Sequence, residues 1–266
     1  MSVKIIRALN RGLDVLQAIH ASKAVSLRDL HLATGLPKPT LLRILKTLME
    51  RELVWQRIAD GAYIAGYTFS ARAGASVDEE AHLAEAAAPI LAELGRRVRW
   101  PSVLAVPRLD HMAVIETNRP ISYFRYILRA PLGFRINMLR SASGRTYLGF
   151  CSEEERAAIV ARLAASSRPG DALAHDPARL DRILAETRDR GYGMRDPDFG
   201  GSYDEPRSRA DDGRNSIAVP IPAHDDIAGC INLTWITKVA PVKAMVERFL
   251  PPLQDAAASI GSRLSA

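Results

Sequence analysis

Apolar residues recur at helical spacing from the start of the chain. Residues 7–20 carry them at steps of three and four, which predicts an amphipathic helix whose buried stripe is Leu9, Leu13, Leu16 and Ile19. A second helix is expected after Ser26, which stands three residues before Asp29 as in a capping box. It should bury Leu27, Leu30 and Ala33 and end at Gly35, a residue that adopts the left-handed conformation readily.

A third helix is expected to begin at Lys38, with Pro39 tolerated in its first turn. Its inward stripe is Leu41 or Leu42 followed by Leu45, Leu48 and Met49, and its polar and basic positions are Lys38, Thr40, Arg43, Lys46 and Thr47. Two short β-prone runs, 53–58 and 62–65, flank Asp60-Gly61, which predicts a hairpin. This order of elements is typical of a winged helix-turn-helix. A three-helix bundle with an appended hairpin is the alternative.

The remainder of the chain alternates between helical and strand patterns. Helices are expected at 83–97, 144–151, 153–165, 177–190 and 242–263, and strands at 103–106, 112–116, 123–128, 217–221 and 229–234. The polar segment 196–215 is interpreted as a mobile loop. We therefore predict an α+β protein: a winged helix-turn-helix domain (1–67), a linker helix (68–82) and a C-terminal α/β domain (83–266) with a mainly antiparallel sheet.

The distribution of charge along the chain sets the first 70 residues apart. They carry ten Lys and Arg against five Asp and Glu, whereas the remainder carries 26 against 25. A module that binds nucleic-acid phosphates needs such an excess. A chance fluctuation of surface charge is the alternative.

The composition, 47% hydrophobic and 25% charged, is that of a soluble globular protein. No apolar run reaches the roughly 18 residues of a membrane span, and the start of the chain does not resemble a signal peptide. Two cysteines, far apart, fit neither a disulfide scaffold nor a metal site, so we expect a cytoplasmic protein without a metal.

The segment Ser141–Arg145 is a candidate anion site. Its small residues let a ligand approach the first amides of the following helix, where the helix dipole favours negative charge. Ser143 would add a hydroxyl and Arg145 a cation, which suits a carboxylate. The alternative is an ordinary capped helix with an exposed arginine.

Catalytic motifs do not account for the chain. Ser143 lies in Ser-Gly-Arg rather than in a G-x-S-x-G elbow, and the six histidines are scattered. The sequence contains no P-loop, dinucleotide fingerprint or HExxH motif. We therefore expect neither enzymatic activity nor a cofactor.

Taken together, these segments resemble the IclR family of transcription regulators. The N-terminal runs "RALNRGLDVLQAI" and "SLRDLHLATGLPKPTLLRILKTLMERELV" are similar to the family's winged helix, and "SASGRTYLGF", "RGYGMRD" and "SIAVPIPAHDDIAGCINLTW" to its second domain. "RRVRWPSVLAV" and "SIAVPI" most resemble the branch that controls catabolism of aromatic acids, such as the hydroxyphenylpropionate regulator. Lys38 and Pro39 depart from the small polar residues usual at the start of the recognition helix, so base readout is not carried over.

The resemblance implies a regulator of a catabolic operon that binds double-stranded operator DNA as a homodimer, usually assembling further to a tetramer. The expected DNA contacts are Lys38, Thr40, Arg43, Lys46, Thr47 and Arg57. The expected effector is a small carboxylate, in particular an aromatic acid, in a pocket of Trp100, Ser102, Met138, Leu139, Ala142, Ser143, Gly144, Arg145, Val219, Cys230 and Asn232. For Cys230 an ordinary core position is the stronger interpretation. The competing interpretations are a small-molecule enzyme with a helical module and a protein-interaction module. Activation and repression stay open.

Overall fold

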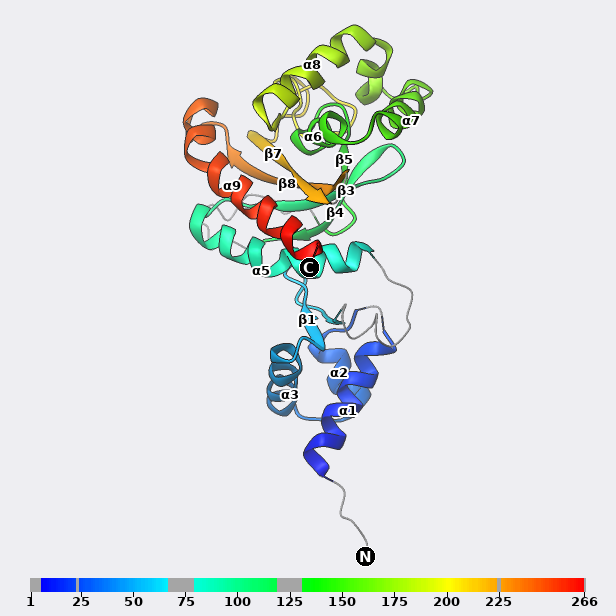
Figure 1. Cartoon of the computed structure of the whole chain (residues 1–266), viewed down its shortest axis with the longest axis vertical. Coiled ribbons are helices and arrows are strands. Elements are labelled where there is room, and N and C mark those ends of the chain that lie inside the picture. The colour runs from blue at the N-terminus through cyan, green and yellow to red at the C-terminus, as the bar shows by residue number, and fades with distance from the viewer. Residues whose placement is uncertain (1–5, 23, 67–78, 119–130, 224–225, 266) are drawn as a thin grey trace, which may run out of the picture. The chain divides into compact units, whose positions relative to one another are not determined.

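The computed structural model describes residues 6–22, 24–66, 79–118, 131–223 and 226–265 (Figure 1). The chain divides into two compact units, residues 1–85 and 86–266. The first is mainly helical and the second is built on an antiparallel sheet, so the predicted α+β class is confirmed.

The N-terminal unit follows the predicted order of elements. It contains α1 (Arg7–His20), α2 (Leu27–Thr34), α3 (Lys38–Glu50) and an antiparallel hairpin of β1 (Val54–Gln56) and β2 (Tyr63–Ala65). The Ser26 hydroxyl accepts a hydrogen bond from the Asp29 amide (3.2 Å), as a capping box requires. Gly35 ends α2 with a φ of 67°. Local sequence signals therefore set both ends of α2.

Only two of the four residues expected in the buried stripe of α1 are buried. Leu16 and Ile19 are buried together with Val15, but Leu9 and Leu13 are 58% and 47% exposed. The reason is that only the C-terminal half of α1 contributes to the apolar core that the helices of this unit share. On α3, the buried member of the Leu41–Leu42 pair is Leu41. Ala33, expected inside, is exposed.

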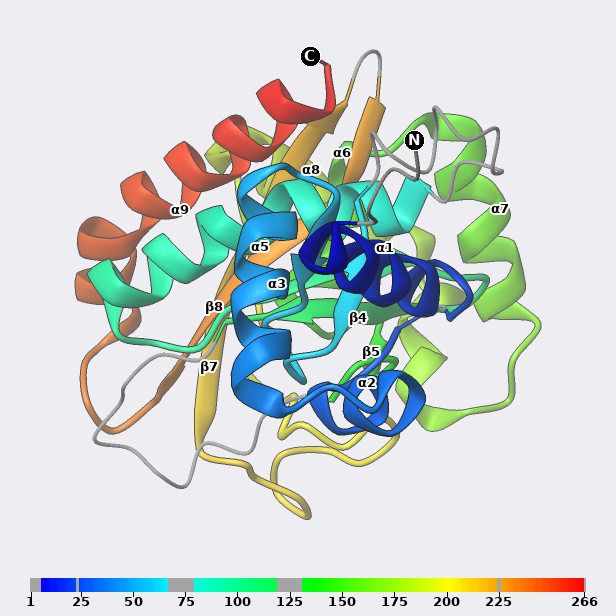
Figure 2. The ribbon, with the colours of Figure 1, turned by 90° about the horizontal axis from the view of Figure 1, so that it is seen from below.

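In the C-terminal unit, the described residues form a six-stranded antiparallel sheet with the order β5-β4-β3-β8-β7-β6. The strands are β3 (Val103–Pro107), β4 (His111–Thr117), β5 (Arg135–Asn137), β6 (Gly193–Met194), β7 (Arg214–Ala223) and β8 (Asp226–Ile236). Helices α6 (Ala142–Phe150), α7 (Glu153–Ala164) and α8 (Pro177–Arg190) cover one face, with a short 3-10 helix, η1 (Pro169–His175). On the other face lie α9 (Val242–Leu264) and the part of α5 (Glu79–Val98) that belongs to this unit, residues 86–98, side by side in Figure 2.

Several predicted elements differ from the structure. Strands β5 and β6 are absent from the prediction because runs of three and two residues show no periodicity. The strand expected at 123–128 lies outside the described residues, as does most of the linker helix expected at 68–82. The last four residues of that predicted linker belong to α5, which runs without a break through position 83.

Helix α6 lies unusually close to its neighbours. A Cβ atom on Gly144 would collide with the Met138 carbonyl oxygen, and one on Gly193 would collide with the Thr146 hydroxyl. That hydroxyl donates to the Ala218 carbonyl (3.0 Å) and accepts from the Gly193 amide (3.0 Å). The N-terminal half of α6 is thereby held close to Met138, just after β5, and to β6 and β7.

This close approach makes Gly144 a stability determinant. We expect Gly144→Ala to destabilise the C-terminal unit by about 2 kcal/mol or more, because the backbone of Met138 must move. Calorimetric unfolding of the full chain measures this change. The control is Gly12→Ala on α1, where a Cβ meets nothing within 4 Å and should stabilise the helix by up to about 1 kcal/mol. If Gly144→Ala and the parent had the same free energy of unfolding, the close packing of α6 against Met138 would be contradicted.

Candidate functional site

Within the described residues, the C-terminal unit holds a cavity of about 830 Å³. It lies between the N-terminus of α6, the adjacent ends of β3, β7 and β8, and the segment 196–212 that connects β6 to β7. A cavity of this size accommodates a ligand of ordinary metabolite dimensions. Its lining combines apolar residues (Pro101, Val103, Phe134, Ile136, Ala142, Phe199 and Ala210) with hydroxyl, amide and charged side chains.

The N-terminus of α6 forms one wall. Ala142 and Ser143 line the cavity, and their amides are the first two of the helix, which have no acceptor within it. The third amide, of Gly144, donates to the Ser141 hydroxyl at 2.9 Å. The Ser143 side chain is only 1% exposed, and its hydroxyl has no hydrogen-bond partner among the described residues. This wall therefore presents hydrogen-bond donors and the positive end of a helix dipole.

Strands β7 and β8 form the floor. Ser216 pairs with Thr234 and Ala218 with Asn232 in the antiparallel register, and Ser216, Asn232 and Thr234 line the cavity. The Asn232 side-chain oxygen accepts a hydrogen bond from the Val103 amide at 3.0 Å. The floor is therefore polar, although it lies on strands with an otherwise apolar pattern.

The segment 196–212 closes the cavity, and arginines hold it in place. Arg195 donates to the Phe199 carbonyl (2.8 Å) and to the Asp212 carboxylate (2.9 Å). Arg140 donates to the carbonyls of Asp198 (3.0 Å) and Glu205 (3.1 Å). The sequence predicts a mobile loop here. In the structure, hydrogen bonds from neighbouring elements tie it down instead.

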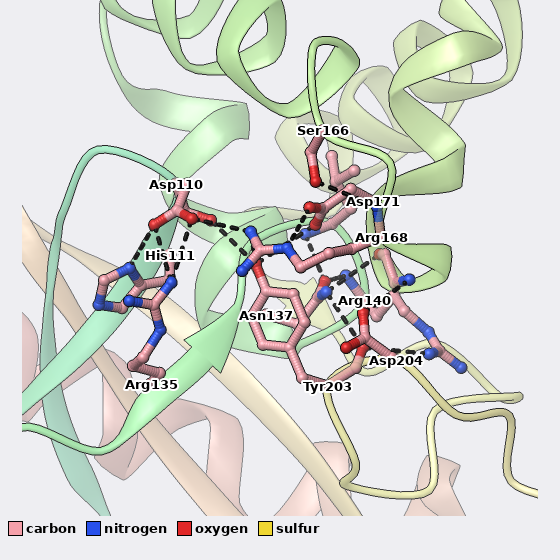
Figure 3. Close-up of polar contacts among 12 residues, drawn as sticks. Asp110, His111, Arg135, Asn137, Arg140, Ser166, Arg168, Asp171, Tyr203 and Asp204 are labelled. Atoms are coloured by element: carbon pink, nitrogen blue, oxygen red, sulfur yellow. Dashed lines mark hydrogen bonds and ion pairs between the residues drawn. The ribbon is translucent and has the colours of Figure 1, made fainter.

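A polar cluster joins this segment to the opposite rim (Figure 3). Arg168 contacts Asp110 (2.8 Å) and Asp171 (3.0 Å), and its guanidinium carbon lies 4.5 Å from the centre of the Tyr203 ring. The Tyr203 hydroxyl donates to the Asp110 carbonyl at 3.1 Å. Partial burial would raise the pKa of Asp110, but hydrogen bonds from His111 and Arg168 outweigh it and lower that pKa. The Asp110 carboxylate is therefore ionised at neutral pH.

Of the residues predicted to bind the effector, Ala142, Ser143 and Asn232 line the cavity. Gly144 follows them but faces Met138. Arg145 points away: its Nε donates to the Leu139 carbonyl (2.8 Å) and its Nη2 forms a buried ion pair with Asp196. The guanidinium is therefore already neutralised and does not act as the cavity's cation.

The remaining predicted residues lie elsewhere. Met138, Leu139 and Cys230 belong to the apolar core beneath α6, α7 and α8. Val219 lies on the opposite face of β7 from Ser216, since successive side chains alternate along a strand. Trp100 and Ser102 are buried, whereas Pro101 and Val103 reach the cavity.

Sequence reasoning found Asn232 but missed the other two polar residues of the floor, Ser216 and Thr234. It also missed the charged residues that line the cavity: Arg135, Arg168, Arg195, Asp204, Asp211, Asp212 and Arg214. The floor had a detectable signal, because Ser216 and Thr234 are polar positions within strongly apolar strands. The arginines come from segments without periodicity, so only the tertiary structure brings them together.

The predicted nucleic-acid surface lies on the N-terminal unit. Lys38, Arg43, Lys46 and Thr47 are exposed on α3 and Thr40 is partly exposed, whereas Leu41, Leu45 and Leu48 face the core. Arg57 follows β1 and forms an ion pair with Asp60 at 2.6 Å. Helix α3 thus presents a basic, polar face to solvent.

Within the described part of the chain, no group of His, Cys, Asp and Glu side chains is arranged to hold a metal ion. In the same residues, each helix is too short or too polar to cross a membrane.

Comparison with known proteins covers both units. The model of the IclR helix-turn-helix domain matches residues 8–57, and that of the bacterial transcriptional regulator IclR C-terminal domain matches residues 75–262. The chain is 30% identical to the acetate operon repressor of Salmonella typhimurium and 29% identical to the transcriptional repressor IclR of Escherichia coli. Each match spans 193 residues, 72% of this chain and 69% of the relative.

Solved structures share the fold. An IclR homolog from Microbacterium hydrocarbonoxydans, crystallised with 4-hydroxybenzoate, aligns with a TM-score of 0.52 at 22% identity, over 97% of this chain and 99% of that one. The matches of both units identify a transcription regulator rather than an enzyme. The chain belongs to the IclR family of bacterial transcription regulators, with an N-terminal domain that binds DNA and a C-terminal domain that binds a ligand.

Proposed function

We propose that this regulator controls a catabolic operon in response to a small carboxylate bound in the cavity beside α6. The observation that carries the proposal is the Ser143 hydroxyl, buried and without a partner among the described residues, next to the first two amides of α6. A buried hydroxyl without a partner is costly, and a carboxylate would satisfy it together with the amides. Ala142 and Ser143 hold the carboxylate, and the helix dipole supplies the attraction that Arg145 does not.

An aromatic acid is the effector class that we propose. Phe134, Ile136 and Phe199 give the cavity apolar surface against which a ring can pack. The relative from Microbacterium hydrocarbonoxydans, whose structure contains 4-hydroxybenzoate, supports the same class.

The DNA-binding domain, which we place in residues 1–67, contacts the operator through α3. Lys38, Thr40, Arg43, Lys46 and Thr47 enter the major groove or contact phosphates, and Arg57 contacts the backbone from the hairpin. Of the two basic residues on the middle of α3, Lys46 has only a loose contact with Glu50 (3.9 Å, both exposed). An exposed ion pair of this kind contributes little free energy, so the Lys46 ammonium stays available to DNA.

The regulator acts as a homodimer that pairs further to a tetramer. The N-cap residue of α1 and the N-terminal half of the helix expose three large apolar side chains spaced by three and four residues: Ile6, Leu9 and Leu13. Such a stripe along one face of a helix favours association with a second copy of the same helix.

The effector site makes a prediction for thermal stability. A carboxylate ligand at about 100 times its Kd should add about 2.7 kcal/mol and raise the melting temperature. Ser143→Trp should abolish the shift, because the indole fills the space beside α6, whereas Ser259→Trp on the exposed face of α9 should keep it. Differential scanning fluorimetry with a panel of aromatic and aliphatic acids measures both. A neutral polyol that raised the melting temperature more than any acid would contradict the carboxylate proposal.

DNA binding should depend steeply on salt. Replacing both Arg43 and Lys46 by Ala should weaken binding to the native promoter fragment about tenfold or more. The salt slope should also fall by about 0.9 for each phosphate that the variant no longer neutralises. Fluorescence anisotropy at several salt concentrations gives both quantities, with Lys238→Ala, an exposed change in the C-terminal unit, as the control. Unchanged affinity would reassign α3 to another partner, as in a protein-interaction module.

The exposed stripe of α1 predicts the oligomeric state. Leu9→Glu combined with Leu13→Glu should reduce the molar mass measured by size-exclusion chromatography with light scattering, because charges then enter the apolar contact. Leu32→Glu is the matched control, since Leu32 is more exposed (70%) but lies on α2. A variant that kept the parent's mass would refute the role of α1.

A further inference from the structure

One large apolar side chain lies in the middle of the basic face of α3. Leu42 is 49% exposed, whereas the leucines on the other side of the helix, Leu41 and Leu45, are completely buried. Among the described residues, the apolar core of the N-terminal unit and the side chains packed against it do not include Leu42. The packing of this unit therefore does not account for a leucine at this position.

The neighbours of Leu42 on the helix surface are cationic. Residues four apart lie on the same side of a helix, so Lys38 and Lys46 lie about 6 Å before and after Leu42 along the helix axis. Arg43 follows Leu42 on the same exposed side. In the described structure, the exposed residues of α3 are Lys38, Pro39, Leu42, Arg43, Lys46, Thr47 and Glu50. Single exposed leucines are common on protein surfaces, but a leucine among cations favours a partner that is a polyanion and also presents an apolar group.

Duplex DNA is such a partner. Among the four standard bases, thymine alone presents an apolar group in the major groove, its C5-methyl, and the other groups there are hydrogen-bond donors and acceptors. Leu42 cannot hydrogen-bond with those polar groups, and covering them would remove their water at a cost in free energy. A leucine that enters the major groove is therefore best placed against a thymine methyl group.

A second copy of α3 fits this surface less well. In a twofold contact the same residues of both copies face one another, so Lys38, Arg43 and Lys46 would meet their own counterparts. Juxtaposed like charges oppose association. The charge around Leu42 therefore favours DNA over self-association through this helix.

We infer that Leu42 is a specificity-determining residue of the DNA-binding domain, and that its side chain contacts the C5-methyl group of a thymine in the operator. The inference rests on the proposed insertion of α3 into the major groove and adds a base preference to it. Attraction between the cations of α3 and the phosphates does not depend on sequence, whereas a contact with this methyl group favours one base.

Deoxyuridine tests the contact directly, because it pairs like thymine and differs from it only by the missing C5-methyl group. Each thymine in the region of the promoter fragment that the protein protects would be replaced singly. Fluorescence anisotropy at one salt concentration would then measure binding of the full chain. At one thymine of each half-site, the replacement should weaken binding about fourfold, the factor expected when one buried group of the size of CH₂ is lost.

Variants assign the effect to Leu42. Leu42→Ala should bind the unmodified fragment more weakly and should no longer respond to deoxyuridine at that thymine. Leu42→Met keeps an apolar side chain of similar volume and should retain the response. The matched control is Leu32→Ala, which removes an exposed leucine (70%) from α2 of the same unit and should leave the response unchanged.

Two further measurements separate a base contact from other effects of Leu42→Ala. The slope of affinity against salt should equal that of the parent, since the variant removes no charge. The melting temperature should also stay close to that of the parent, because the side chain lies outside the apolar core.

The inference is overturned if no deoxyuridine changes the affinity of the parent, or if Leu42→Ala responds at every thymine as the parent does. A lower molar mass of Leu42→Ala in light scattering would also overturn it, because the side chain would then belong to a protein contact. In these cases the major-groove proposal stands as long as replacing both Arg43 and Lys46 by Ala weakens DNA binding. If that double variant binds as tightly as the parent, α3 is not the helix that contacts DNA, and the inference falls with the proposal.

Discussion

The close seating of α6 on the sheet is the constraint on which the cavity depends. The helix can start where it does only because Gly144 has no side chain to meet the Met138 carbonyl. The Thr146 hydroxyl then bridges two backbone groups, the Ala218 carbonyl and the Gly193 amide. Together these contacts point the first amides of α6 into the cavity rather than into solvent, which gives a neutral stretch of backbone the character of an anion site.

Arginine has a structural role around this cavity. Arg140 and Arg195 bind backbone carbonyls of the segment 196–212, and Arg168 lies between two carboxylates and the Tyr203 ring. The planar guanidinium suits such a role because it donates several hydrogen bonds in fixed directions. The carboxylates of Asp110, Asp171 and Asp212 neutralise the positive charge, so the lining is rich in arginine without being strongly cationic. In the proposed site, the helix amides and neutral side chains therefore bind the ligand.

Charged side chains are arranged differently in the two units. The first 70 residues have an excess of positive charge, ten Lys and Arg against five Asp and Glu, and α3 has an exposed basic face, as association with a polyanion requires. The C-terminal unit pairs its charges internally, through contacts such as Arg145 with Asp196 and Arg195 with Asp212. A ligand in the second unit therefore meets a pre-formed polar site, and DNA meets a charged surface.

Local sequence determined much of this protein. The two ends of α2, with the Ser26 cap and the Gly35 stop, and the Asp60-Gly61 turn follow from interactions within a few residues, which is why they are predictable. The α6 wall, with Ala142 and Ser143, is predictable for the same reason.

Only the tertiary structure decided which residues share the cavity. Met138 and Leu139 are expected in the pocket but fill the core, as does Cys230, in line with the stronger interpretation of that residue. Arg145, expected as a free cation, pairs with Asp196. Leu9 and Leu13 fit a helical stripe whose burial depended on where neighbouring helices end. Periodicity states which side of an element is apolar. Whether that side meets a core, a cavity or solvent depends on contacts between residues far apart in the chain, such as Asn232 with Val103.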